Sequence, residues 1–282
     1  LETVHAQAHV RLAIVRILQI GGLRFDVRFD QLNVAFALQV DFVHRREGVE
    51  QRFVAPERFN LWPQAAKHTQ WPGAGKPGDP AFDAFYATQF PSLISFPKQQ
   101  QLNRDAGIAL LDKIGPSILF NHAFGGFMGW GVADRRPDLV KAIIAMEING
   151  NPFAAQLRWG LTAGPMTYDT PVNDVSEFKL VDRTAPPDMP RPVVSPYKLQ
   201  AEPARKWKNL SKIPIAWMTS EFGGGGSPVT NVEFLKQVGC QAEMLRLRDY
   251  GIYGNGNLML LEKNNHEVFT VLRDWLEKKG VA

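Results

Sequence analysis

Residues 117–147, which read SILFNHAFGGFMGWGVADRRPDLVKAIIAME, decide the fold of this chain. A short apolar run ends at Phe120, and a turn rich in small residues follows it at once. A helical stretch then ends before Pro137, and a second apolar run covers residues 142–146. Two short apolar runs on either side of a helical segment predict two buried parallel strands joined by a right-handed crossover.

The same alternation extends to both sides of this stretch. A helix is expected over residues 102–114, where apolar residues recur at helical spacing. It is expected to stop at Gly115-Pro116. Further along the chain we expect strands at 213–218 and 242–247 and helices at about 229–238 and 258–279. Strands that alternate with helices predict an α/β fold with a mostly parallel, doubly wound sheet.

The chain outside this core is organised differently. From Leu23 to Phe42 apolar residues alternate with polar ones, which predicts two half-buried strands that turn near Asp30. Two segments rich in proline, at about 55–95 and 151–210, are expected to form a cap or lid. We therefore divide the chain into N-terminal strands of open assignment (1–52) and one α/β domain (53–282).

Composition excludes several classes of protein. The 282 residues include one cysteine, Cys240, which excludes a disulfide framework and a thiolate zinc site. Lys and Arg (32) barely outnumber Asp and Glu (28) and are dispersed, so no nucleic-acid partner is expected. No apolar stretch approaches the roughly 20 residues of a membrane helix, and no intact signal peptide is seen. We expect a soluble globular protein without metal or cofactor, with a cytoplasmic location favoured and a secreted one open.

The turn at residues 121–126, NHAFGG, has the pattern of a nucleophile elbow. In such an elbow a strand passes through a strained residue directly into a helix, and small neighbours avoid clashes. The strained residue carries the nucleophile, and the backbone N–H of the next residue stabilises an oxyanion. Here the nucleophile position is Ala123, which has no nucleophilic atom, and the oxyanion position is Phe124.

Several longer segments carry a resemblance to a known family. They are residues 53–64 (FVAPERFNLWPQ), 68–73 (HTQWPG), 133–142 (ADRRPDLVKA), 254–257 (GNGN) and 261–265 (LEKNN). In this order they make the chain from about residue 53 to the C-terminus resemble an α/β-hydrolase family of bacterial and fungal serine esterases. The resemblance implies an α/β-hydrolase fold with cap insertions and an ester or lactone as the ligand.

The resemblance also assigns site positions. The family elbow reads His-Ser-Gln-(Ser/Gly)-Gly, so Ala123 stands where the family has its serine. Glu147 matches the catalytic acid, and Asn257 stands where the family has the catalytic histidine. Tyr253 replaces a second histidine of the same turn. The glycine-rich oxyanion loop of the family should precede Phe53 but is not found in residues 1–51.

A triad needs a nucleophile and a base, and a methyl group and a neutral amide supply neither. We therefore predict no ordinary ester hydrolysis by this chain. Three interpretations remain open: a hydrolase whose sequence is imperfectly read at these positions, a pseudoenzyme that binds a small ligand, and a lyase or isomerase with Glu147 as base. The oligomeric state is open, a homodimer included.

Other chemically active side chains receive structural interpretations. They are the histidines His122, His68 and His266, the loop carboxylate Glu221 as a weaker rival to Glu147, and Cys240 as a buried inert thiol. Trp62, Trp71 and Trp130 fit a pocket lining and simple packing equally well. Residues 223–226, four consecutive glycines, predict a flexible loop.

Overall fold

The computed structural model describes residues 40–42, 46–89, 92–93, 95–148, 150–184, 196–223 and 228–281. Its centre is a parallel sheet in which the strand order is β3-β4-β7-β8. The strands of this sheet are β3 (Ser117–His122), β4 (Val140–Met146), β7 (Pro214–Thr219) and β8 (Gln241–Arg246). The chain thus has the α/β-hydrolase-type core that its sequence predicts.

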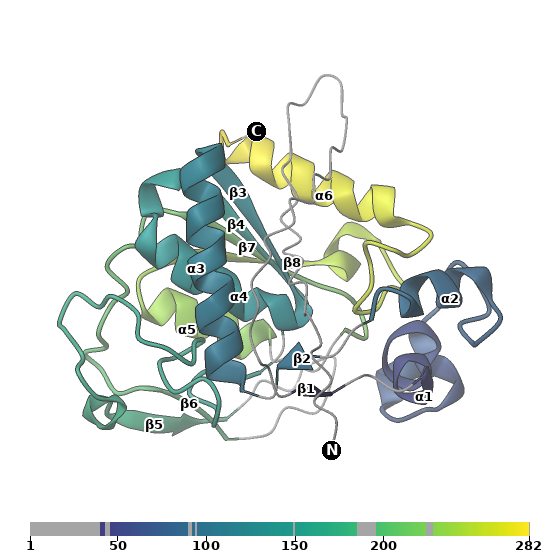
Figure 1. The fold of residues 1–282 in the computed structure, drawn as a ribbon, viewed down its shortest axis with the longest axis horizontal. Coiled ribbons are helices and arrows are strands. Elements are labelled where there is room, and N and C mark those ends of the chain that lie inside the picture. Colours follow the sequence, from purple (N-terminus) through teal and green to yellow (C-terminus); the bar gives the residue numbers. More distant parts are fainter. Residues whose placement is uncertain are drawn as a thin grey trace, which may run out of the picture.

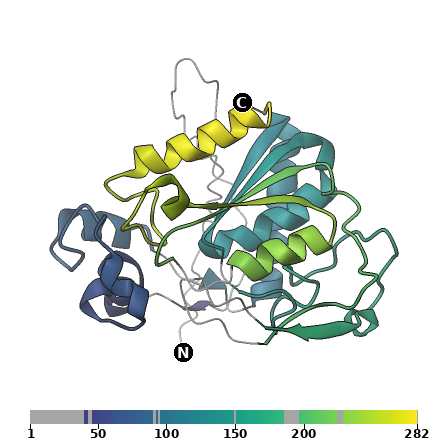
Figure 2. The same ribbon diagram turned by 180° about the vertical axis from the view of Figure 1, so that it is seen from behind.

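Helices cover both faces of this sheet (Figures 1 and 2). The main helices are α3 (Phe96–Ile114), α4 (Gly126–Arg135), α5 (Pro228–Gln237) and α6 (Asn265–Lys278). Side chains of α3, α4 and α5 share one apolar cluster with Ile143 and Ile215, whereas α6 packs on the opposite face against Ile144 and Met218. The sheet is therefore doubly wound.

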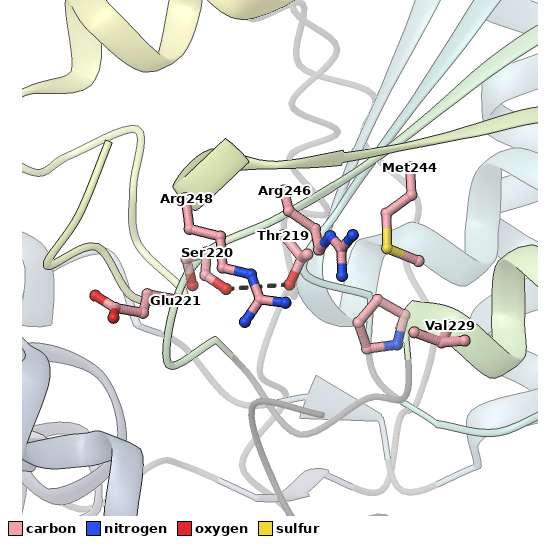
Figure 3. Close-up of a pocket in the computed structure, with 8 residues that line it drawn as sticks. Thr219, Ser220, Glu221, Val229, Met244, Arg246 and Arg248 are labelled. Atoms are coloured by element: carbon pink, nitrogen blue, oxygen red, sulfur yellow. Dashed lines mark hydrogen bonds between the residues drawn. The ribbon is translucent and has the colours of Figure 1, made fainter. Parts of the chain in front are cut away.

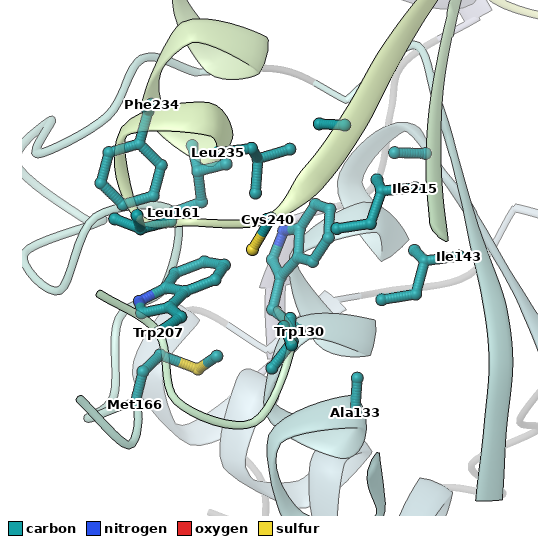
Figure 4. Packing of buried hydrophobic residues seen from close by; sticks show 14 of the residues in the cluster. Trp130, Ala133, Ile143, Leu161, Met166, Trp207, Ile215, Phe234, Leu235 and Cys240 are labelled. Carbon is teal, nitrogen blue, oxygen red and sulfur yellow. The ribbon is translucent and has the colours of Figure 1, made fainter. Parts of the chain in front are cut away.

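Aromatic side chains fill the larger of the two clusters (Figure 4). Trp130 of α4 is fully buried, and its ring stacks on Trp217 of β7 with 6.4 Å between the ring centroids. Trp207 lies between Trp130 and Phe234 of α5, at centroid distances of 6.1 and 5.4 Å. Aromatic rings bury large areas and prefer offset-stacked, tilted or edge-on arrangements of this kind to a face-to-face sandwich. Trp130 is therefore a core residue, and packing alone accounts for it.

Local signals explain where α3 begins and ends. The Ser95 hydroxyl accepts a hydrogen bond from the N–H of Lys98, and Pro97 occupies the first turn, where its missing N–H is harmless. Gly115 ends the helix with a φ of +80°, a conformation in which a Cβ would be strained. The helix delivers the chain to β3 and so to the elbow.

The predicted core elements occur within a few residues of their expected bounds, except at the starts of two helices. The helix expected over residues 102–114 is α3, which begins earlier, at Phe96. The last helix was expected from about residue 258, but α6 begins at Asn265. Residues 258–264 form turns instead, in which Leu261 N–H bonds to the Leu258 carbonyl and Lys263 N–H to that of Gln70. The prediction was wrong here because apolar residues at helical spacing, such as Leu258 and Leu261, do not reveal contacts with a distant segment.

The predicted strand pair at residues 23–42 lies almost entirely outside the described residues. Its last part is β1 (Val40–Phe42), which pairs antiparallel with β2 (Ser92–Leu93). The division at residue 52 stays a prediction.

The proline-rich segments contain only short elements. The first segment follows α1 (Arg46–Val49) and a π-helical turn (Glu50–Val54). It contains two 3₁₀ turns (Pro56–Arg58 and Pro63–Lys67) and α2 (Pro80–Tyr86). The second segment lies between β4 and β7 and holds a 3₁₀ turn (Val175–Glu177) and the hairpin of β5 (Leu180–Arg183) and β6 (Tyr197–Gln200). That these segments form a cap over the site stays a prediction.

No helix among the described residues is both long enough and apolar enough to span a bilayer.

The core predicts a clear difference between two leucine truncations. Leu111 of α3 is fully buried, whereas Leu180 on β5 is 37% exposed. Leu111→Ala should lower the free energy of unfolding by about 2–5 kcal/mol because it leaves a cavity. Leu180→Ala should change it by no more than about 0.5 kcal/mol. Urea unfolding of both variants checks this, and equal losses would contradict the assigned core.

Candidate functional site

The sharp bend after β3 has the geometry of a nucleophile elbow. The strand ends at His122, a single 3₁₀ turn (Ala123–Gly125) follows, and α4 begins at Gly126. Ala123 has a φ of +47°, in the left-handed region that side chains with a Cβ rarely adopt. This conformation costs about 1–2 kcal/mol relative to a right-handed one. The elbow is thus retained, strain included, although its central residue carries only a methyl group.

The close approach of α4 to the sheet requires glycine at two positions beside the elbow. A Cβ on Gly126 would lie 2.1 Å from Cγ1 of Ile148, and one on Gly129 would lie 2.1 Å from the side chain of Asn121. Both distances are far below van der Waals contact, so larger residues would push the helix away from the strand ends.

Glu147 lies beside Ala123 at the carboxyl edge of the sheet. The last paired residues of β3 and β4 are His122 and Met146, so Ala123 and Glu147 each follow a pair in register. Glu147 is also left-handed, with a φ of +50°. Two neighbouring strands therefore both end in a strained residue at the same level of the sheet edge.

The Glu147 carboxylate is buried and anchored. Its Oε1 accepts a hydrogen bond from the N–H of Ser220 (2.5 Å) and one from the Thr219 hydroxyl (3.2 Å). On the other oxygen, a Cβ placed on Gly223 would lie only 2.2 Å from Oε2. Both oxygens therefore lie against the segment that follows β7, which fixes the direction of the carboxylate.

The third predicted position, Asn257, lies in the turn at residues 254–257 and is 3% exposed. Nε2 of His122 lies 2.6 Å from the Asn257 carbonyl oxygen, so the ring N–H donates to it. Because His122 precedes Ala123, this contact joins the turn to the elbow. The Asn257 side-chain nitrogen, Nδ2, is buried and has no hydrogen-bond partner. The structure thus brings all three positions to one edge of the sheet, while their roles remain predictions.

Phe124, the predicted oxyanion position, lies in the 3₁₀ turn Ala123–Gly125, directly after Ala123. Its side chain is 46% exposed and its ring meets Phe96 edge-on, at 5.2 Å between centroids. The expected glycine-rich oxyanion loop falls on residues outside the described part of the chain.

A pocket adjoins the residues that anchor Glu147 (Figure 3). It holds about 310 Å³ of space between atoms and is open to solvent on one side. The pocket lies between the ends of β7 and β8 and the start of α5, and Thr219, Ser220, Met244, Arg246 and Arg248 are among its lining residues. Arg246 pairs with Asp249 at 3.0 Å.

Several side chains with structural interpretations have the expected surroundings. Glu221 forms an ion pair with Lys67 at 2.8 Å. Cys240 is buried, and burial raises the pKa of its thiol to about 12, so it is not a thiolate near pH 7. His266 is exposed on α6. The loop predicted at residues 223–226 lies mostly outside the described residues.

Sequence reasoning missed one polar group of the site region. His68 contacts two carboxylates, Glu57 and Glu262, and Glu262 in turn holds the turn that carries Asn257. Glu57, His68 and Glu262 all lie in segments that carry the family resemblance, but nothing in their spacing indicated that residues 194 apart in the chain meet.

The chain is 39% identical over 229 residues to a protein described as "Probable secreted lipase phiG" from Fungal sp. (strain ATCC 74256). This match agrees with the esterase-type resemblance of the sequence. It includes 78% of this chain but only 62% of the relative, so the chain spans less than two thirds of its relative's length. No family profile matches the chain.

Solved structures similar to this chain include an esterase and an α/β hydrolase. One is a novel bacterial esterase, with 16% identity and a TM-score of 0.44. The match covers 71% of this chain and 50% of that protein. Another is an α/β hydrolase from the metagenome of lagoon sediments of Mar Chica, Morocco, with 13% identity, a TM-score of 0.38 and coverages of 71% and 83%.

The strain at the elbow predicts an unusual response to glycine. Ala123→Gly should leave the free energy of unfolding unchanged or raise it by up to about 1 kcal/mol, because glycine tolerates a positive φ. The control Ala133→Gly, at a buried position inside α4, should lower it by about 1–2 kcal/mol. Chemical denaturation of both variants measures this, and equal losses would show that the elbow is unstrained.

The buried ring of His122 predicts a pH effect on stability. Burial lowers the pKa of His122 from its ordinary value of 6.5, and the hydrogen bond to the Asn257 carbonyl opposes this only in part. The unfolded chain therefore takes up this proton at a higher pH than the folded one. The resulting stability is complete above about pH 6.5 and is lost as the pH falls through the lowered folded-state pKa.

The measurement is urea unfolding at pH 7 and pH 5. His122→Gln keeps an N–H donor but cannot titrate, so its free energy of unfolding should fall less between the two pH values than that of the unmodified chain. His266→Gln, at an exposed histidine, serves as the matched control and should retain the full decrease. An unchanged decrease in His122→Gln would contradict the prediction.

Proposed function

We propose that this chain is an esterase-type α/β hydrolase whose site binds an ester- or lactone-like small molecule and does not turn it over by the serine mechanism. The observation that carries the proposal is the strained elbow at Ala123 beside Glu147. A positive φ at a residue with a Cβ is unfavourable, and such strain is found where a site needs it. The relative named as a lipase supports the ester-type ligand.

Nucleophilic attack is the step that this chain lacks. In a triad the serine oxygen attacks the ester carbonyl while a histidine takes its proton and a carboxylate orients the histidine. Ala123 has no atom that can attack, and the Asn257 amide cannot accept a proton near pH 7. Only the carboxylate position keeps its residue type, and Glu147 is held as an orienting group would be.

Asn257 supports ligand binding in place of catalysis. Its Nδ2 is buried without a partner, and an unsatisfied buried donor of this kind costs about 1–3 kcal/mol. A ligand carbonyl or ester oxygen that accepts from Nδ2 would recover this energy. The amide would thus act as a fixed donor where the family resemblance places a base.

The alternative of a lyase or isomerase with Glu147 as base receives less support. A general base needs an oxygen that can reach the ligand's proton. Oε1 already accepts from Ser220 and Thr219, and Oε2 lies against the backbone of Gly223. This arrangement fits an orienting carboxylate better than a proton acceptor. Any turnover that Glu147→Gln abolishes would favour the alternative.

A restoration experiment tests the proposal. The unmodified chain should not hydrolyse 4-nitrophenyl butyrate above the rate of the Ala123→Gly variant. The double variant Ala123→Ser with Asn257→His should hydrolyse it at least about 10³-fold faster, because triad members act as a unit. Each single variant should stay close to background for the same reason.

Two further measurements sharpen this test. Glu147→Gln in the restored background should reduce kcat, since the new histidine would lose its orienting carboxylate. The saturable binding of butyrate or a butyrate ester to the unmodified chain, followed by calorimetry, should weaken in Asn257→Leu. Two outcomes would overturn the proposal. One is hydrolysis by the unmodified chain that depends on neither Ala123 nor Glu147. The other is a double variant that is correctly folded but inactive.

A further inference from the structure

The turn at residues 254–257 has no place in the sheet, so side chains must hold it. The Gly256 N–H donates to both oxygens of Glu262, at 2.9 and 3.1 Å, and Nδ2 of Asn255 donates to Oε2 of Glu262 at 2.7 Å. Asn255 also exchanges two side-chain hydrogen bonds with Asn264. Glu262 is 1% exposed and is the acceptor on which the turn converges.

Glu262 is itself held by His68. Nε2 of His68 lies 3.1 Å from Oε1 of Glu262, and Nδ1 lies 2.9 Å from Oε2 of Glu57. The His68 side chain is 1% exposed, that of Glu262 is fully buried, and that of Glu57 is 33% exposed. A chain of three titratable groups thus runs from the partly exposed Glu57 to the buried turn.

The number of protons in this chain matters because a neutral imidazole has only one N–H. With both carboxylates ionised, only the doubly protonated ring can donate to Glu57 and Glu262 at once. A buried carboxylate such as Glu262 is costly unless it is hydrogen-bonded, so it depends on partners such as His68. No group of three or more His, Cys, Asp or Glu side chains in the described residues could hold a metal ion.

Packing makes the position of the turn depend on this ring. Phe222 meets His68 edge-on, with 4.7 Å between the ring centroids, and a Cβ on Gly256 would lie 2.2 Å from Cζ of Phe222. The other charged groups nearby are Glu221, which accepts from the Gly254 N–H at 3.4 Å, and its partner Lys67. The Phe222 ring therefore packs between the His68 imidazole and the turn at residues 254–257.

We propose that Glu57, His68 and Glu262 form a positioning relay that holds residues 254–257, and with them Asn257, against the elbow. The role of Asn257 in this statement rests on the proposed function, but the relay itself does not. The His68 ring bridges the two carboxylates, so its removal leaves Glu262 without this partner and lets the turn loosen.

Amide hydrogen exchange tests the relay in the full chain without any ligand. Exchange of a peptide covering residues 252–260 should be about tenfold faster in His68→Gln than in the unmodified chain, because glutamine can donate only one of the two hydrogen bonds. Helix α5 should exchange equally in both proteins.

Control variants separate positioning from general stability. Glu262→Gln should accelerate the same peptide at least as much as His68→Gln, Glu57→Gln should do so less, and the exposed His266→Gln should have no effect. Unchanged exchange of residues 252–260 in His68→Gln, or acceleration spread equally over α5, would overturn the relay. If His68→Gln does not fold, Glu57→Gln, at the partly exposed end of the relay, gives the answer, and unchanged exchange in that variant would overturn the relay.

A second readout links the relay to the site. If the restored double variant is active, adding His68→Gln should lower kcat and shift its pH profile while KM changes less than about twofold, because the base is displaced rather than the ligand contacts. An inactive double variant would count against the proposed function and leave the exchange result intact. Faster exchange without any effect on kcat would show that the relay does not position residue 257.

Discussion

The register between β3 and β4 is the constraint on which the site depends. Because His122 pairs with Met146, the next residue of each strand leaves the sheet at the same level. Both of these residues, Ala123 and Glu147, have a positive φ, so each side chain departs from the alternation of its strand. A shift of one residue would exchange the two faces of a strand and separate the elbow from the carboxylate. The glycines of α4 preserve this geometry because they let the helix begin directly at the strand end.

The other side of the site is assembled by polar contacts between distant segments. His122 reaches the Asn257 carbonyl from the sheet, while Glu262 and His68 hold the same turn from the opposite direction. Most of these groups are buried and hydrogen-bonded, which makes such networks rigid and specific in position. Asn257 Nδ2, by contrast, is buried and has no hydrogen-bond partner among the described residues. These contacts do not involve the side chains at positions 123 and 257, so the turn is held whatever residues stand at these positions.

Ala123 and Asn257 show why likeness to an esterase and activity are separate questions. The chain has a parallel α/β core and a relative named as a lipase. A methyl group and an amide nevertheless stand at the positions where the resemblance places a nucleophile and a base. The positive φ of Ala123 and the anchored Glu147 carboxylate lie at the same sheet edge, so the site is a defined subject for restoration by two substitutions.

The sequence by itself determined the α/β class, the order of the core elements and the elbow, because short apolar runs and small-residue turns are local signals. It also indicated Glu147 and Asn257 through the family resemblance. Only the tertiary structure decided that α6 begins at Asn265, that Trp130 belongs to the core, and that His68 joins Glu57 to Glu262. These facts depend on contacts between residues far apart in the chain, and no periodicity in one segment records which distant segment it will touch.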